Sequence, residues 1–305
     1  MDKIKIVVIA GPTASGKSAV AAALASELNG EIVSADSVQV YRRLDIGAAK
    51  PPQEVRAMAA HHLIDIVEPG FDYTAARFVE DADKAIADIR SRGKNVFVAG
   101  GTGLYIKALL SGIFDGGEAD KDYRDELVLF AASRGAALLH ARLKEVDPAA
   151  AAAIHPNNTR RVIRALEVYH TTKKPISAHH REHGFSRQRY DALKIGLGRD
   201  RAGLYADIDA RVDEMISRGL LEETRSLLNS GFSPGLRAMS SLGYKEMIGY
   251  IQGLYPFDEA VRLIKRNTRH YAKRQLTWFR KDPGIRWFNP AEFYDIMSAV
   301  RRHIG

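Results

Sequence analysis

Eight residues near the amino terminus have the types and spacing that bind phosphate. They match a glycine, any four residues, and then Gly-Lys-Ser: Gly11, Pro12, Thr13, Ala14, Ser15, Gly16, Lys17 and Ser18. In such a P-loop, backbone N–H groups surround phosphate oxygens, the lysine adds a positive charge, and the serine hydroxyl is a ligand for Mg²⁺. The pattern predicts a phosphate-binding loop, but it leaves open whether the phosphate belongs to ATP or to another compound.

Two further motifs can share this site. Asp36 directly follows a short apolar run, residues 31–35, and a carboxylate there can bind Mg²⁺ or act as a general base. A turn-capping aspartate is the alternative interpretation of Asp36. Residues 100–103, Gly-Gly-Thr-Gly, follow another apolar run, and their glycines permit close approach of a ligand or simply form a tight turn.

The surrounding segments have the periods of elements that bring these motifs together. We expect strands over residues 4–10, 31–35, 96–99 and 193–197, and helices over residues 17–28 and 78–90. Strands that alternate with helices predict a parallel α/β sheet. Because ligands bind outside the carboxyl ends of such strands, the three motifs are expected at one edge of the sheet.

A helical segment interrupts this pattern. Residues 115–120 are rich in glycine and acid and resemble a linker, and residues 121–170 have helical periods only, with Asn158 or Thr159 as one N-cap. We therefore predict an α/β fold, a P-loop NTPase-like parallel sheet core with a helical insertion domain and a helical C-terminal region. The predicted core covers residues 1–117 and 188–305, and the insertion covers residues 118–187.

The net charge is concentrated near the carboxyl terminus. Of 45 Lys and Arg and 37 Asp and Glu, eleven basic and three acidic residues lie in residues 261–305, which carry the whole net charge of +8. A helix predicted over residues 258–281, with Asp258 as its N-cap, has one basic stripe: Arg262, Lys265, Arg266, Arg269 and Lys273. A localised basic face favours a polyanion, above all nucleic acid, and a solvated helix without a partner is the alternative.

The composition excludes several classes of protein. The apolar fraction of 46% and the charged fraction of 27% are ordinary for a globular protein. Cysteine is absent, which excludes disulfides, thiolate metal sites and a cysteine nucleophile. No apolar run is long enough to span a bilayer, so we expect a cytoplasmic protein without a membrane partner, and a monomer is the default expectation.

Nine motifs in sequence order resemble the tRNA dimethylallyltransferases, also called tRNA isopentenyltransferases. They occupy residues 11–18, 36–41, 45–51, 61–65, 100–105, 155–157, 160–167, 243–246 and 272–279. The resemblance implies transfer of a dimethylallyl group from dimethylallyl diphosphate to N6 of the adenine 3′-adjacent to the anticodon. It also implies that the P-loop holds the diphosphate with Mg²⁺ at Ser18, and that the adenine is flipped into the core.

The resemblance also implies roles for individual residues. Asp36 is the expected catalytic base, with Thr13 and Lys17 beside the reaction centre. The insertion is expected to grip the anticodon stem-loop of tRNA. The expected tRNA contacts are Asp36, Ser37, Val38, Gln39, Thr102, Arg124, Arg160, Arg161, Arg164, Gly243, Tyr244 and Lys245.

Three positions depart from the family pattern. Ala48 replaces a usual threonine, Asn158 a usual aspartate, and Asp207 an arginine that is expected to help hold the diphosphate. A negative charge there should weaken donor binding, unless Arg211 substitutes for the arginine, or Asp207 pairs with a cation or helps bind Mg²⁺. Two alternatives therefore stay open: a tRNA-binding paralogue with weakened or altered specificity, and a P-loop small-molecule kinase.

Overall fold

The computed structural model describes residues 3–112, 120–184 and 188–305. They form two compact units, the first built from residues 1–110 and 188–305 and the second from residues 111–187. The predicted linker at 115–120 and both predicted domain boundaries fall largely on residues outside those described. Within the described ranges, no helix is long and apolar enough to cross a membrane.

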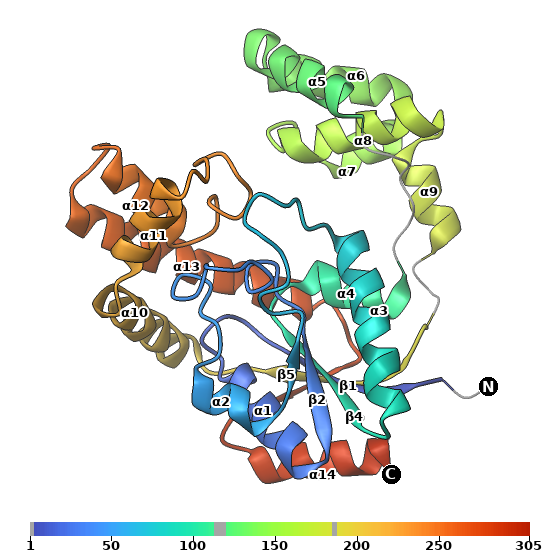
Figure 1. Cartoon of the computed structure of the whole chain (residues 1–305). Coiled ribbons are helices and arrows are strands. Elements are labelled where there is room, and N and C mark those ends of the chain that lie inside the picture. Colours follow the sequence, from blue (N-terminus) through green and yellow to red (C-terminus); the bar gives the residue numbers. More distant parts are fainter. Residues whose placement is uncertain (1–2, 113–119, 185–187) are drawn as a thin grey trace. The chain divides into compact units, whose positions relative to one another are not determined.

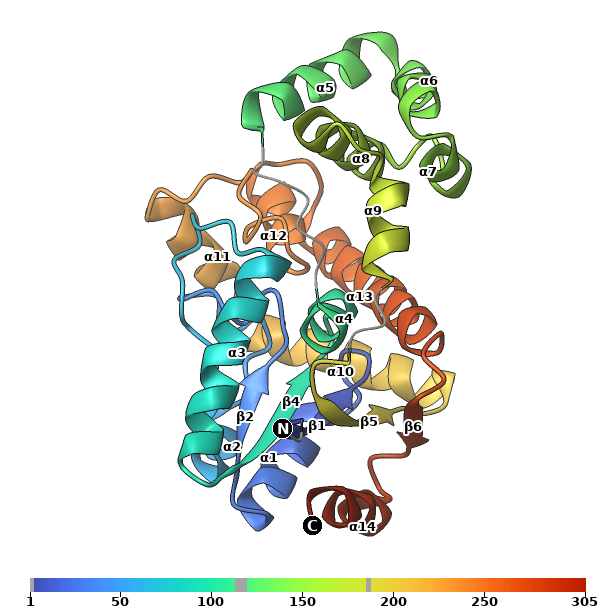
Figure 2. The ribbon, with the colours of Figure 1, turned by 90° about the vertical axis from the view of Figure 1, so that its right-hand side faces the viewer.

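The first unit is built on a parallel sheet. Its strands are β1 (Lys5–Ala10), β2 (Gly30–Ser34), β3 (His61–His62), β4 (Asn95–Gly100), β5 (Asp191–Leu197) and β6 (Ile285–Phe288). The six strands of this sheet have the order β3-β2-β4-β1-β5-β6, and every neighbouring pair is parallel. Figure 2 shows β2, β4, β1, β5 and β6 side by side in that order. The predicted α/β class is confirmed.

Alternation along β1 sends side chains into two cores. Ile6 and Val8 lie in the larger core, whereas Val7 and Ile9 face the smaller one. The smaller core is covered by α1 (Lys17–Glu27) and α14 (Phe293–Ile304), which lie on the same side of the sheet in Figure 1. Strands of parallel sheets are typically covered on both faces. Because β1 is buried on both faces, residues 6–10 form a continuous apolar run and not an alternating one.

The larger core lies under the remaining helices of this unit. They are α3 (Ala75–Ser91), α4 (Gly103–Ser111), α10 (Arg201–Ser217), α11 (Leu220–Asn229), α12 (Tyr244–Ile251) and α13 (Phe257–Phe279). The short α2 (Gln53–Met58) precedes β3. Helix α13 begins after Pro256 as its N-cap, so the prediction of Asp258 as N-cap is wrong. Asp258 lies in the first turn, where its carboxylate still favours the helix dipole.

In the described part of the second unit, residues 111–112 and 120–184, the regular elements are all helices. They are α5 (Lys121–Arg134), α6 (Ala136–Val146), α7 (Pro148–Ala153), α8 (Thr159–Thr172) and α9 (Ile176–His183). Leu127, Leu139, Leu143 and Val162 form the centre of its own core. Buried Asp147 caps α7 through the N–H of Ala150, and Asn158 is the N-cap residue of α8 without a side-chain bond.

Candidate active site

The P-loop connects β1 to α1, and its backbone shape requires glycine at two positions. Gly16 has a left-handed φ of 79° just before α1 begins at Lys17. A side chain at Gly11 would lie 2.8 Å from the carbonyl oxygen of Leu197 in β5, so the loop needs glycine there as well. The Lys17 amine donates to the carbonyl of Pro12 at 3.1 Å and thereby folds over the loop. This is the geometry of a phosphate cradle at a helix N-terminus.

Asp36 lies two residues beyond the end of β2 with one carboxylate oxygen fixed. Its Oδ1 accepts hydrogen bonds from the backbone N–H groups of Val38 at 2.9 Å and Gln39 at 3.3 Å. Its Oδ2 has no hydrogen-bond partner among the described residues. Asp36 is therefore a turn-capping aspartate that still has one carboxylate oxygen available, so the two interpretations of this residue are compatible.

The P-loop lysine shares a low-dielectric region with this carboxylate. The pKa of Lys17 is lowered to about 8, chiefly by burial and also by the positive charge of Arg211, while the charge of Asp36 opposes the shift. Burial also lowers the pKa of Arg211 itself, and Asp36 counteracts that shift too. Two cations thus lie within electrostatic range of one carboxylate, a pattern that is typical of an anion site.

Helix α13 joins the loops that follow β1 and β4. The Thr13 N–H donates to the Gln275 side-chain oxygen at 2.9 Å, and the Gln275 amide donates to the carbonyl of Gly101 at 2.9 Å. A side chain on Gly101 would lie 2.2 Å from that amide nitrogen, which explains this glycine of the Gly-Gly-Thr-Gly motif. The Thr102 hydroxyl accepts from the Ser37 N–H at 3.1 Å, so the loop after β2 joins them.

Loop 45–50 is held by an acidic side chain from α11. Glu223 accepts hydrogen bonds from the N–H groups of Asp45, Ile46 and Gly47 at 2.9–3.2 Å, and from the Tyr244 hydroxyl at 2.6 Å. Burial raises the pKa of Tyr244, and the Glu223 carboxylate raises it further. Tyr244 is fully buried, so its ring holds this loop rather than presenting a surface to a ligand.

Two of the departures from the family pattern, Asp207 and Ala48, have defined surroundings in the first unit. Asp207 forms an ion pair with Arg199, which neutralises the reversed charge. Arg211, one helical turn further along α10, is the cation near Lys17 and Asp36. The side chain of Ala48 is buried in the larger core. The structure thus contains a cation paired with Asp207, and it also places Arg211 where a substitute for the usual arginine could act.

The expected tRNA-contacting arginines of the helical unit fall into two groups. Arg124 and Arg164 both bind the fully buried carboxylate of Glu167, at 2.7 and 2.9 Å, with about 40% of each arginine side chain exposed. Arg160 and Arg161 are exposed at the start of α8. Glu167 lies in the motif at 160–167 and anchors two cations, a role that its burial in the structure reveals.

The basic stripe of α13 is partly neutralised. Arg262 pairs with Glu259, Lys265 with Asp213, and Arg269 with Asp209. Arg266 and Lys273 are exposed and have no ion pair within the described part of the chain. The five basic residues of the predicted stripe all lie on α13, but two of their acidic partners come from α10, which the sequence pattern does not place beside this helix.

The donor set suits Mg²⁺ that is shared with a phosphate ligand. Ser18 lies in the first turn of α1, and Asp36 lies within electrostatic range of the adjacent Lys17. No group of three or more His, Asp or Glu side chains suited to a metal occurs in residues 3–112, 120–184 and 188–305. Mg²⁺ usually keeps several waters and takes one or two protein ligands beside phosphate oxygens, so this sparse set fits the ion.

Fold and site together define a P-loop α/β protein in which a phosphate cradle faces a carboxylate. The model of the IPP transferase family matches residues 39–282. The chain is 51% identical to tRNA dimethylallyltransferase 2 of Geotalea uraniireducens (strain Rf4), with 99% of this chain and 97% of that protein covered. It is also 51% identical to tRNA dimethylallyltransferase of Geobacter sulfurreducens, with 100% and 98% covered.

Two solved structures share the fold. The full-length tRNA isopentenylpyrophosphate transferase from Bacillus halodurans is 41% identical with a TM-score of 0.74, with 99% of this chain and 97% of that chain covered. A eukaryotic dimethylallyltransferase acting on tRNA is 30% identical with a TM-score of 0.82, with 98% and 77% covered. The chain belongs to the IPP transferase family.

Proposed function

We propose that this chain transfers a dimethylallyl group from dimethylallyl diphosphate to N6 of the adenine 3′-adjacent to the anticodon of tRNA, with release of diphosphate. The observation that carries the proposal is a P-loop whose lysine folds over it, with the Asp36 carboxylate within electrostatic range of that lysine. The relatives named tRNA dimethylallyltransferase support the reaction, and the solved relative described as acting on tRNA supports the acceptor.

The P-loop is the proposed site of the leaving group. As the bond between the allylic carbon and the diphosphate oxygen breaks, the diphosphate leaves with the electron pair and gains negative charge. Backbone N–H groups of the P-loop, to which Pro12 contributes none and in which Gln275 occupies that of Thr13, stabilise that charge together with the charges of Lys17 and Arg211. Mg²⁺, when bound at Ser18 and the diphosphate, supplies further charge neutralisation.

Asp36 is the proposed base. The exocyclic amine of adenine is a weak nucleophile, and it attacks the allylic carbon as the carbon–oxygen bond breaks. The free Oδ2 of Asp36 accepts a hydrogen bond from N6, orients the amine and takes its proton. We place Thr13 at the same reaction centre. Gln275 fixes the Thr13 backbone beside the loop after β4.

The helical unit is the proposed grip on the anticodon stem-loop. Four arginines supply phosphate contacts: Arg124, Arg160, Arg161 and Arg164. In the first unit, the proposed tRNA contacts are Asp36 with Ser37, Val38, Gln39, Thr102, Gly243, Tyr244 and Lys245. Because Tyr244 is buried, we assign its contribution to the shape of loop 45–47 and the direct contact to exposed Lys245. We further propose a cytoplasmic location, since the acceptor is tRNA, and a monomeric chain.

A three-arm incubation tests this function. The protein receives unmodified tRNA with dimethylallyl diphosphate and Mg²⁺, the same tRNA without donor, or γ-labelled ATP with nucleosides. We expect prenylated adenosine in the first arm only, as measured by mass spectrometry of the digested nucleosides. Labelled nucleotide product in the third arm would instead identify a kinase. Binding of tRNA without prenylation would identify a non-catalytic paralogue.

A further inference from the structure

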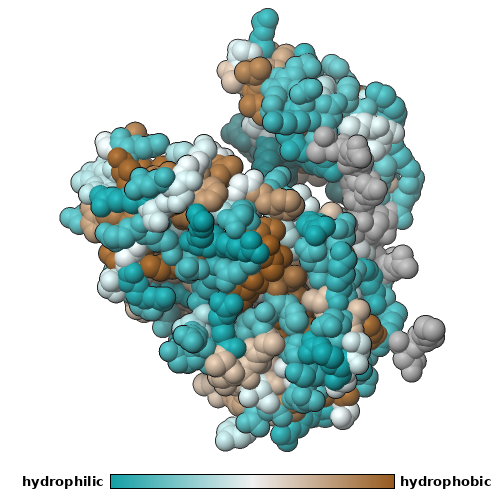
Figure 3. Space-filling view, viewed as in Figure 1, coloured by the Kyte–Doolittle hydropathy of each residue, from teal (hydrophilic) through white to brown (hydrophobic). Residues whose placement is uncertain are grey.

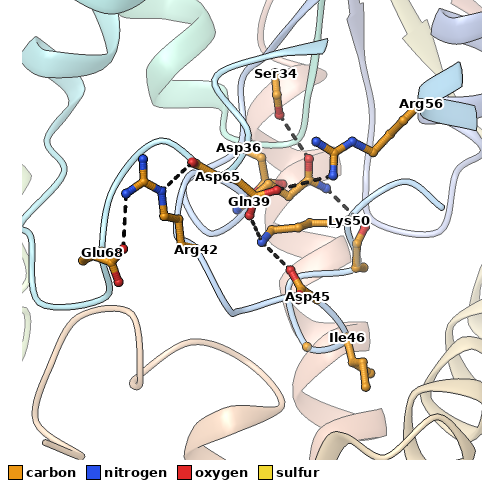
Figure 4. A network of polar contacts seen from close by, with 12 residues as sticks. Ser34, Asp36, Gln39, Arg42, Asp45, Ile46, Lys50, Arg56, Asp65 and Glu68 are labelled. Carbon is orange, nitrogen blue, oxygen red and sulfur yellow. Dashed lines mark hydrogen bonds and ion pairs between the residues drawn. The ribbon is translucent and has the colours of Figure 1, made fainter. Parts of the chain in front are cut away.

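Lys50 is a buried cation that the proposed chemistry leaves without a role. Only 5% of its side chain is exposed, and its amine lies between two carboxylates, Asp45 at 2.6 Å and Asp65. Figure 4 shows the lysine side chain reaching both of them. Asp65 also pairs with Arg56 at 3.3 Å. A lysine this buried is rare unless it is paired, so the ion pairs account for its burial but not for its place beside the candidate site.

A chain of backbone hydrogen bonds leads from this ion pair to Asp36. The N–H of Asp65 donates to the carbonyl of Gln39 at 3.1 Å. The N–H of Gln39 in turn donates to Oδ1 of Asp36 at 3.3 Å, next to the bond from Val38 at 2.9 Å. The residue that Lys50 holds is therefore bonded directly to the residue that orients the proposed base.

A second connection runs through the side chain of Gln39. Its amide donates to the carbonyl of Ala49 at 3.2 Å, and its oxygen accepts from the Ser34 hydroxyl at 3.1 Å. Arg211 donates to the same Ala49 carbonyl at 3.4 Å. Ala49 immediately precedes Lys50, so the position of the lysine backbone bears on the hydrogen bonds that Gln39 and Arg211 make to the Ala49 carbonyl. Figure 4 shows Ser34, Gln39 and Lys50 around Asp36.

The backbone near Asp65 is strained. Leu63 and Asp65 have φ values of 63° and 59°, in the left-handed region that residues other than glycine seldom adopt. Such conformations persist only where the surrounding contacts over-determine them. Leu63 is buried in the larger core, and Asp65 is held by Lys50, Arg56 and the carbonyl of Gln39. The ion pair with Lys50 is thus one of the contacts that maintain this shape.

We propose that Lys50 is a positioning residue for Asp36, and this inference rests on the proposed function. By holding Asp65 and Asp45 together, Lys50 keeps the N–H of Gln39 on Oδ1 and leaves Oδ2 directed at the adenine amine. Without the lysine the two carboxylates repel each other, and the backbone that orients Asp36 shifts. A small misplacement of a reacting group lowers the rate of the chemical step more than it lowers substrate binding.

A double-mutant cycle tests this role, because a residue that acts through Asp36 loses its effect when Asp36 is removed. Single-turnover rates of prenyl transfer are measured for the wild type, Lys50→Met, Asp36→Asn and the double variant. We expect Lys50→Met to slow transfer about 30-fold in the wild type and less than about threefold in Asp36→Asn. The dissociation constant for tRNA should change less than about threefold in both backgrounds.

Lys94→Met is the matched control. This lysine also pairs with a buried carboxylate, Glu31 at 2.6 Å, but it precedes β4 at the opposite edge of the sheet. Glu31 keeps Arg92 and His62 as partners after the substitution, so the rate should stay within about twofold of the wild type. If Lys50→Met does not fold, Asp65→Asn replaces it in the same cycle, since it weakens the same ion pair at a half-buried position.

If Lys50→Met slowed transfer by the same factor in the wild-type and Asp36→Asn backgrounds, the positioning role would be overturned. Lys50 would then act only on the stability of the fold and not through Asp36. Full activity of Lys50→Met would overturn it as well. Both outcomes require a wild type that prenylates tRNA, so they are distinct from failure of the proposed function, in which the wild type itself forms no product.

Discussion

Gln275→Leu tests whether one buried amide ties the P-loop to the glycine-rich loop. Gln275 is 6% exposed and makes two bonds of 2.9 Å, to the N–H of Thr13 and the carbonyl of Gly101. Leucine has a similar size but leaves the buried carbonyl of Gly101 and the half-buried N–H of Thr13 without partners. An unpaired buried group costs about 1–3 kcal/mol and the half-buried N–H costs about 1 kcal/mol, so the free energy of unfolding should fall by about 2–4 kcal/mol.

Urea unfolding followed by circular dichroism measures this change, with the slope of the transition compared between the variants. Gln252→Leu is the control, because Gln252 is exposed at the end of α12, and a change of less than about 0.5 kcal/mol is expected there. The loosened Thr13 should also raise the KM for dimethylallyl diphosphate. A loss of stability in Gln275→Leu no larger than in the control would refute the reasoning.

Three further predictions concern charge. Because the pKa of Lys17 is lowered to about 8, kcat/KM for the donor should fall as the pH rises through about 8, and a profile flat to pH ~9.5 would contradict this. Glu167→Ala leaves two arginines without their shared carboxylate, so the free energy of unfolding should fall by about 2–3 kcal/mol in thermal melts. The substitution should also weaken tRNA binding in filter assays. Unchanged stability and unchanged tRNA binding would count against this role of Glu167. Asp207→Ala should change the donor KM less than about threefold because Asp207 pairs with Arg199, whereas Arg211→Ala should raise it at least about tenfold. The reverse order in steady-state assays would restore position 207 as the donor contact.

Local sequence patterns predicted the elements that position the site. The β-branched run before Gly11, the glycine in the left-handed position 16 and the alternation of strands and helices gave the P-loop between β1 and α1. Strands β3 and β6 were not predicted, because β3 has two residues and β6 contains exposed Arg286 and Trp287. Such short, half-exposed strands have no period that distinguishes them from loops.

The contacts of the site between residues far apart in the chain could not be predicted from local sequence patterns. Gln275 lies 262 residues from Thr13, and its hydrogen bond depends on how α13 packs on the sheet edge. Arg211 was considered as a substitute for an arginine at 207, but only the packing of α10 places it near Lys17. The same packing brings acidic residues of α10 to the stripe of α13, where a pattern read along one helix predicts only free cations.

The central claim is that Asp36 and the P-loop together perform prenyl transfer to tRNA. The most direct test compares the wild type with Asp36→Asn in a single turnover with saturating dimethylallyl diphosphate and Mg²⁺, with tRNA binding measured on the same samples. We predict that the wild type prenylates the adenine 3′-adjacent to the anticodon, and that Asp36→Asn binds tRNA but transfers at least about a hundredfold more slowly. Full turnover by Asp36→Asn, or no prenylated adenosine from a wild type that binds tRNA, would contradict the account.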